Sequence, residues 1–240
     1  MRFALLLVLG FAANLHAYDL TPPRACRQML VVETPAWASV DGLLQRYMRA
    51  AKNAPWQKVG APIPIVVGRN GLAWGLGEHG EPPERARWKR EGDNCGPAGL
   101  FALPSAFGYE AASPGLKLRY TQVTPQWEAI DDPNSLYYNQ IVNRGKVFRV
   151  DWRSSEKMRR DDELYRLGIV VAHNPEGVPG AGSCIFLHVW RGTGQGTAGC
   201  TAMSGEAIAE VQRWLDPAQK PSLLQLPREL MPEAFRTAGR

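Results

Sequence analysis

The sequence lacks an apolar run long enough to cross a membrane. The run near the N-terminus, Phe3–Ala13, has 11 residues, whereas a membrane-spanning helix needs about 20. It follows Arg2 and precedes the small residue Ala17, a pattern typical of a cleaved secretory signal. We therefore expect a signal peptide over residues 1–17, export to a bacterial periplasm and no stable membrane span, with a retained anchor as the alternative.

Clusters of basic residues, low-complexity linkers and internal repeats are also missing. The net charge of +5 is spread along the 240 residues, without the basic patches or interleaved aromatic residues of nucleic-acid surfaces, so no nucleic-acid partner is expected. Because no linker or repeat marks a boundary, residues 18–240 are predicted to form a single domain, although two small domains would also fit this length. We expect this domain to be a monomer.

Cysteine is scarce, and no spacing resembles a zinc site, because the histidines are isolated from one another and no C-x-x-C occurs. We expect no metal and no cofactor. The four cysteines allow three complete disulfide pairings, and cysteines of exported proteins are more often paired than free. If Cys200 stays unpaired, a Cys26–Cys95 bridge is compatible with the sequence, and Cys184 would be buried as a small apolar side chain.

Short segments rich in β-branched and aromatic residues dominate the chain, and turn residues bound most of them. They predict strands over 28–33, 63–68, 71–76, 116–123, 145–152, 167–173 and 182–190. Two segments have helical periodicity, 39–53 with Ser39 as its N-cap and 204–217 with Ser204 as its N-cap. The expected fold is mainly β, with a helix near each end.

One strand and the turn after it contain groups suited to cysteine chemistry. In the strand 182–190, alternation places Cys184, Phe186 and His188 on one face. The glycine-rich stretch "RGTGQGTAG" then leads to Cys200. A thiol beside an imidazole and close backbone amides is the arrangement that acyl transfer through cysteine requires. A disulfide and a small buried side chain remain alternative interpretations of Cys200.

Several motifs, in order along the chain, support the first interpretation. "FLHV…TAGCTAM", "KREGDNCGPAGLFAL", "PIPIVVGRNGLAWGLG", "DDPNSLYYNQIV", "WRSSEKM" and "YRLGIVVAHN" resemble segments of the L,D-transpeptidase catalytic domain (YkuD-type) family, in its exported branch. The resemblance covers most of the chain after residue 17. It implies one YkuD-type domain of mixed, sandwich-like β-sheets with a few flanking helices, acting on peptidoglycan stem peptides as donor and acceptor.

The resemblance also implies roles for individual residues. Cys200 would be the nucleophile and His188 the base, and the amides of the Gly199/Cys200 turn would hold the oxyanion. No acidic partner of His188 is evident, so a backbone carbonyl near Val189 or Gly192 is expected to orient the imidazole. If water replaces the acceptor amine, the same site is an L,D-carboxypeptidase. A catalytically silent wall-binding protein with Cys200 in a disulfide is the alternative from another class.

The cysteine motif departs from the commoner "S-H-G-C-[IV]-R" of the family. Thr197 and Ala198 replace the Ser and His, and Ala202 stands at the Arg position, so this chain must place substrate differently. The candidates for substrate binding are Thr197, Ala198, Asn174, Tyr138, Asn139, Glu156 and Arg191.

Other notable residues have structural interpretations. We expect Trp190 to pack in the core and His79 to lie in a solvated loop. Asp131 and Asp132 are expected to be turn or cap residues, with a paired-carboxylate site as the alternative. His173 is expected to be an ordinary strand-end histidine, with a second active-site group as the alternative.

Overall fold

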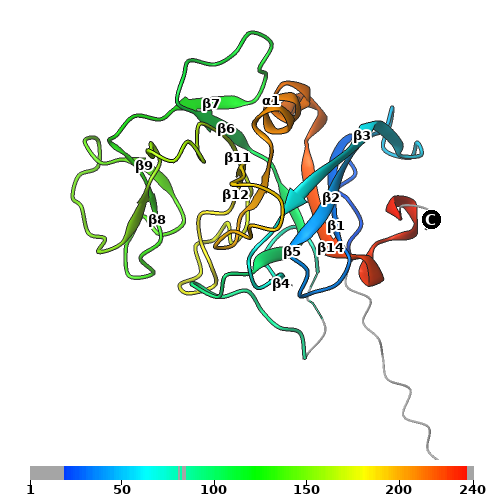
Figure 1. The fold of residues 1–240 in the computed structure, drawn as a ribbon, viewed down its shortest axis with the longest axis horizontal. Helices are drawn as coiled ribbons and strands as arrows, with labels where there is room; N and C mark the ends of the chain where they lie inside the picture. The colour runs from blue at the N-terminus through cyan, green and yellow to red at the C-terminus, as the bar shows by residue number, and fades with distance from the viewer. Residues whose placement is uncertain (1–18, 81, 83–84, 237–240) are drawn as a thin grey trace, which may run out of the picture.

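The computed structural model describes residues 19–80, 82 and 85–236. It is a mainly β protein with an 11-stranded mixed sheet, a small three-stranded sheet and one short α-helix (Figure 1). The predicted signal peptide over 1–17 lies outside the described residues. Within the described part of the chain, no helix has the length and apolar character needed to cross a membrane.

The large sheet has the strand order β4-β5-β14-β1-β2-β3-β13-β12-β11-β6-β7, and the small sheet has the order β10-β8-β9. The strands are β1 (Gln28–Thr34), β2 (Asp41–Met48), β3 (Gln57–Val66), β4 (Leu72–Trp74), β5 (Gly96–Ala102), β6 (Ser105–Gly108), β7 (Arg119–Gln122), β8 (Trp127–Ile130), β9 (Ile141–Asn143), β10 (Ser155–Lys157), β11 (Leu167–Val170), β12 (Phe186–Val189), β13 (Thr201–Met203) and β14 (Ser222–Pro227). The helices are α1 (Gly205–Trp214) and the 3-10 helices η1 (Pro217–Gln219), η2 (Arg228–Leu230) and η3 (Glu233–Phe235).

The strands that come first and last along the chain, β1 and β14, lie side by side in the large sheet and run parallel (Figure 1). Every residue of both strands is buried, which explains their nearly continuous apolar sequences. The two strands belong to the main hydrophobic cluster. A second, smaller cluster contains Phe107, Tyr165, Cys184, Phe186 and Cys200.

The predicted helix over 39–53 is wrong, because this segment forms β2. β2 pairs with β1 on one side and β3 on the other, and a β-bulge lies between Leu44 and Arg46. The bulge and double pairing bury the consecutive residues 44–47, which an amphipathic helix would not do. Gly42 fits the strand because a Cβ there would meet the backbone oxygen of Glu33 at 2.6 Å. Tertiary pairing here overrides the local helical pattern.

The predicted strand over 145–152 is also wrong. No strand covers these residues, and Phe148 is fully exposed. Asp151 instead accepts hydrogen bonds from Ser135 Oγ and the Leu136 N–H, and Trp152 Nε1 donates to Glu128. The segment is therefore a connection held by side chains, and pairing resumes only at β10.

The predicted helix over 204–217 is confirmed as α1. Ser204 is its N-cap, and the Ser204 side chain accepts a hydrogen bond from the Ala207 N–H. Ile208 and Val211 are buried. The Gln212 side chain donates to the backbone oxygens of Phe107 and Gly168, which attaches the helix to β6 and β11.

All four cysteines are free and buried, so the Cys26–Cys95 bridge is wrong. Cys26 Sγ contacts the Gln28 oxygen, and Cys95 Sγ contacts the Asn70 oxygen. Cys184 is buried in the small cluster, as predicted.

Candidate active site

β12 positions His188 beside the chain that leads to Cys200. This strand is antiparallel to β11 and parallel to β13, so His188 lies opposite Ala202. The predicted alternation is confirmed, since Ile185 and Leu187 belong to the main cluster whereas Cys184 and Phe186 belong to the smaller one. The Tyr165 ring packs edge-on against His188 at 5.2 Å and fixes the plane of the imidazole.

The tautomer of His188 follows from its hydrogen bond. Nδ1 lies 2.7 Å from the backbone oxygen of Val189. Because a carbonyl oxygen can only accept, Nδ1 must carry the proton when the ring is neutral, and Nε2 is the basic nitrogen. The expectation that a backbone carbonyl orients the imidazole is confirmed at Val189. Nε2 makes no hydrogen bond to any described residue, so it is available for a proton.

The turn before Cys200 is fixed to the end of β3. The Thr197 N–H donates to the Val67 oxygen, and the Arg69 N–H donates to the Thr197 oxygen. Gly196 allows this close approach, since a Cβ there would lie 2.6 Å from the Arg69 Cα. Thr197 Oγ1 donates to the Cys200 oxygen at 2.6 Å. These contacts hold Cys200 at the start of β13.

The Cys200 sulfur is held by β12. The Phe186 N–H donates to Cys200 Sγ at 3.3 Å, and Sγ lies 3.7 Å from the Cys184 oxygen. A backbone N–H on sulfur favours the thiolate, while burial opposes it. The thiol is thus oriented but strongly desolvated.

His188 and Cys200 both line one cavity of about 400 Å³. Among the described residues, its walls combine neutral, cationic and anionic side chains. The lining includes Arg69, Lys89, Glu91, Gly92, Asn94, Asp131, Glu156, Arg160, Leu164, Tyr165, Ser183, Cys184, Ile185, His188, Trp190, Arg191, Gln195, Gly196, Thr197, Ala198, Gly199 and Cys200. The cavity is large enough for a peptide segment.

Burial sets the protonation of both reactive groups. Desolvation raises the pKa of the Cys200 thiol to about 12, and the nearby Glu156 carboxylate adds to this rise. Desolvation lowers the pKa of His188 to about 4. At neutral pH the pair is therefore a neutral thiol and a neutral imidazole. Nucleophilic attack by Cys200 requires the thiol proton to move to a base such as His188 Nε2.

The backbone amides at the turn differ in availability. The Gly199 N–H donates to Thr197 Oγ1 at 3.0 Å, so it is occupied. The Cys200 N–H has no hydrogen-bond partner among the residues that the structure describes. Of the two amides expected to hold an oxyanion, only that of Cys200 is available in this arrangement.

The structure brings some of the predicted site residues together. Seven of them line the cavity: His188, Cys200, Gly199, Thr197, Ala198, Glu156 and Arg191. The Tyr165 hydroxyl donates to Glu156 Oε2. The Arg191 guanidinium forms an ion pair with Asp162 at 3.0 Å, which partly occupies it.

The other three predicted residues lie outside this cavity. The Asn174 side chain bonds to the backbone of Val178 and Gly182 and holds the loop after β11. Asn139 donates to the backbone oxygens of residues 173 and 174 and accepts from the Cys184 N–H. Tyr138 donates to Glu91 at 2.6 Å. These residues support the cavity wall.

Sequence reasoning missed several charged residues of the cavity. Lys89 and Glu91 lie in the quoted segment "KREGDNCGPAGLFAL", and this resemblance is the signal that could have indicated them. Arg69 lies in another quoted segment, "PIPIVVGRNGLAWGLG", so it had the same kind of signal, whereas Arg160 lies in none of the quoted segments. Asp132 does cap a turn, accepting from the N–H groups of Asn134 and Arg153.

Two more structural interpretations need correction. Asp131, expected to be a turn residue, lines the cavity, and its buried Oδ1 has no hydrogen-bond partner in the described part of the chain. Trp190 also lines the cavity and is only half-buried, so its predicted core position is wrong.

The remaining described histidines are structural. His173 is buried, as an ordinary strand-end histidine would be, and its two ring nitrogens lie 3.2 Å from the Leu76 nitrogen and 3.0 Å from the Ala181 oxygen. The solvated loop predicted for His79 is wrong, since this ring packs between Trp74 and Phe101. Across residues 19–80, 82 and 85–236, no three His, Cys, Asp or Glu side chains converge as metal ligands would.

Comparisons of the chain with protein-family models, curated proteins and solved structures found no match. The resemblance to L,D-transpeptidases therefore remains a prediction based on the motifs.

Proposed function

We propose that the protein is a peptidoglycan L,D-transpeptidase with a YkuD-type catalytic domain, acting in the periplasm. One observation carries this proposal. An oriented thiol, Cys200, and an imidazole with an unbonded Nε2, His188, line the same cavity. A thiol and a base in one site are the requirements of acyl transfer through cysteine.

In the first step, the Cys200 thiol proton passes to His188 Nε2 as the sulfur attacks the carbonyl that follows an L-centre of the donor stem. The carbonyl electron pair moves to oxygen and gives an oxyanion. When the oxyanion collapses, the C–N bond breaks and the leaving D-amino acid takes the proton from His188. The product is a thioester on Cys200.

In the second step, an amine of another stem attacks the thioester. His188 Nε2 accepts the amine proton and returns it to the departing Cys200 sulfur. Hydrolysis of the thioester by water would make the same site an L,D-carboxypeptidase, so the acceptor decides the reaction class. A neutral His188 with a lowered pKa is in the correct form to accept a proton in both steps.

The cavity charges suit a peptide with both carboxylate and ammonium groups. Arg69 has no carboxylate partner among the described residues, and it is the cation we assign to a carboxylate of the stem. Asp131 and Glu156 supply negative charge on the same walls for an ammonium group. Arg191 is a weaker choice for the carboxylate because Asp162 already binds it.

The proposed function is tested by mass spectrometry of products formed from purified disaccharide-tetrapeptide. We expect a cross-linked dimer with the mature protein and none with the Cys200→Ala variant. Fragmentation of the dimer identifies which carbonyl was joined. Tripeptide and free D-Ala without dimer would instead identify an L,D-carboxypeptidase.

Cys184→Ala is the matched control, because Cys184 is the other cysteine of the same cavity. We expect this variant to retain the reaction. If the mature protein forms neither product while Cys200 remains alkylatable, the proposed function is wrong. The silent wall-binding alternative required Cys200 in a disulfide, and no disulfide is formed by the four free cysteines.

A further inference from the structure

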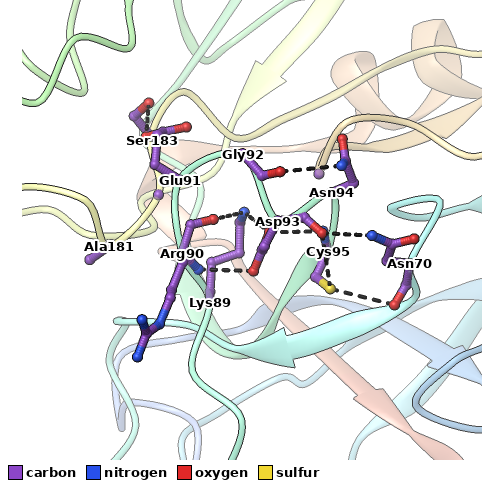
Figure 2. Close-up of polar contacts among 12 residues, drawn as sticks. Asn70, Lys89, Arg90, Glu91, Gly92, Asp93, Asn94, Cys95, Ala181 and Ser183 are labelled. Carbon is purple, nitrogen blue, oxygen red and sulfur yellow. Dashed lines mark hydrogen bonds and ion pairs between the residues drawn. The ribbon is translucent and has the colours of Figure 1, made fainter.

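A buried ammonium group forms part of the cavity wall next to the cysteine turn. Lys89 is only 5% exposed, yet it lines the cavity that contains Cys200. Its Nζ forms an ion pair with Asp93 Oδ1 at 2.6 Å and donates to the Arg90 oxygen at 3.0 Å (Figure 2). An ammonium has three N–H donors, so one is left without an acceptor among the described residues.

The loop around Lys89 fixes the position of this charge. Asp93 also accepts hydrogen bonds from the N–H groups of Arg90 and Cys95, and Figure 2 shows it at the centre of these contacts. The Lys89 N–H donates to the Trp74 oxygen, which anchors the loop to the end of β4. The ammonium is therefore held in one position by contacts within the protein.

The ammonium is also close to the site of attack. A Cβ built on Gly199 would lie 3.6 Å from Lys89 Nζ, and Cys200 follows directly in the chain. The Gly199 N–H is already bonded to Thr197 Oγ1, which leaves the turn one donor short of a two-donor oxyanion site. Ala202, at the position where the related motif has Arg, supplies no positive charge.

We propose that Lys89 is a catalytic residue that supplies the second donor of the oxyanion site, together with the Cys200 N–H. This inference rests on acyl transfer at Cys200. When the sulfur bonds to the carbonyl carbon, the electron pair on oxygen is stabilised by the ammonium without proton transfer. The thiol proton stays on His188 Nε2 until the leaving group takes it, so the charges balance.

The test compares two reactions of the same sulfur. Acetylation of Cys200 by p-nitrophenyl acetate passes through an oxyanion, whereas alkylation by iodoacetamide does not. Both use the thiolate, so the ratio of their rate constants cancels any change in thiolate population. In Lys89→Met we expect this ratio to fall about 100-fold, the usual effect of losing one oxyanion donor. In Lys89→Arg, which keeps the charge, the ratio should fall less.

An unchanged ratio in Lys89→Met would overturn the proposal, because Lys89 would then act on the thiolate or on the loop alone. Asp93→Asn is the matched control for the loop: it weakens the ion pair but keeps the ammonium, and we expect the ratio to fall less than tenfold. If Lys89→Met does not fold, Lys89→Gln removes the charge but keeps N–H donors for the loop, and we expect the ratio to fall less than in Lys89→Met but more than in Lys89→Arg. Failure with stem peptides but a lowered acetylation ratio would reject only the substrate assignment.

Discussion

His188 in β12 and His173 just after β11 are both buried, but the hydrogen bonds of their ring nitrogens differ. Burial lowers the pKa of each ring to about 4. Both nitrogens of His173 have backbone partners, whereas His188 has one at Nδ1 and leaves Nε2 unbonded in a cavity. A lowered pKa alone therefore does not identify a catalytic base. What distinguishes His188 is an unbonded ring nitrogen in a cavity that also contains the Cys200 thiol.

The surroundings of the two rings match this difference. Around His173, Asn139 and Asn174 hold the loop through side-chain bonds to the backbone, so the region is closed and satisfied. Around His188, the Tyr165 ring packs against the imidazole, and the cavity that His188 lines also has charged side chains in its walls. The first region serves stability, and the second has room for substrate.

We expect the largest effect from replacing His188, and a much smaller effect on the reaction rate from replacing His173. His188→Gln keeps a donor for the Val189 oxygen but removes the basic nitrogen, and we expect thioester formation to slow about 1000-fold. His173→Gln should change the rate less than threefold. The rates are measured by quenched-flow mass spectrometry with disaccharide-tetrapeptide. Similar losses in both variants would remove the distinction between the two regions.

The pH dependence of stability tests the lowered pKa that the two histidines share. Each has a folded-state pKa near 4 and an ordinary unfolded-state value near 6.5, so the unfolded chain binds more protons below pH 6.5. Stability should therefore be complete above about pH 6.5 and fall as the pH drops to 4, by about 3 kcal/mol for each ring. Urea unfolding across this range measures it. A flat profile would contradict the burial of both rings.

His173→Leu sharpens the comparison through stability. At pH 7 the variant leaves the Leu76 N–H without its acceptor, and we expect a loss of about 1–3 kcal/mol in the free energy of unfolding. The difference from the parent protein should shrink as the pH falls to 4.5, because only the parent loses stability through this ring. A difference that stays constant with pH would show that the titration of His173 does not contribute.

Tyr165→Phe gives the smallest expected effect. The variant keeps the ring that packs against His188 but loses the hydrogen bond to Glu156, so we expect about 1 kcal/mol of destabilisation and a few-fold slower thioester formation. Tyr165→Leu, which removes the edge-on ring contact, should slow the reaction further. Equal rates in the two variants would mean that ring packing does not orient His188.

The sequence was sufficient to predict the parts of the site that one strand and one turn determine. Alternation along residues 182–190 placed His188 correctly, and the glycines before Cys200 indicated a tight turn. The helix α1 was predictable because Ser204 and the spacing of Ile208 and Val211 are local signals. These features depend on neighbours a few residues apart.

The features that were missed depend on distant residues. β2 resembles a helix in its own sequence, and only its pairing with β1 and β3 makes it a strand. Lys89 reaches the cysteine turn because its loop is bonded to residues near 70, where the Asn70 N–H donates to the Asn94 oxygen, and the adjacent Arg69 N–H donates to the Thr197 oxygen. The β-branched neighbours of Phe148 predicted a strand. In the structure, hydrogen bonds that the Asp151 side chain accepts hold this segment in place of strand pairing.

The most direct test of the central claim is the intact mass of the protein after brief reaction with disaccharide-tetrapeptide and an acid quench. The account predicts an added mass equal to the disaccharide-tripeptide acyl group, located on Cys200 by peptide mapping and absent from Cys200→Ala. An adduct on another residue, or product formation by Cys200→Ala, would contradict it.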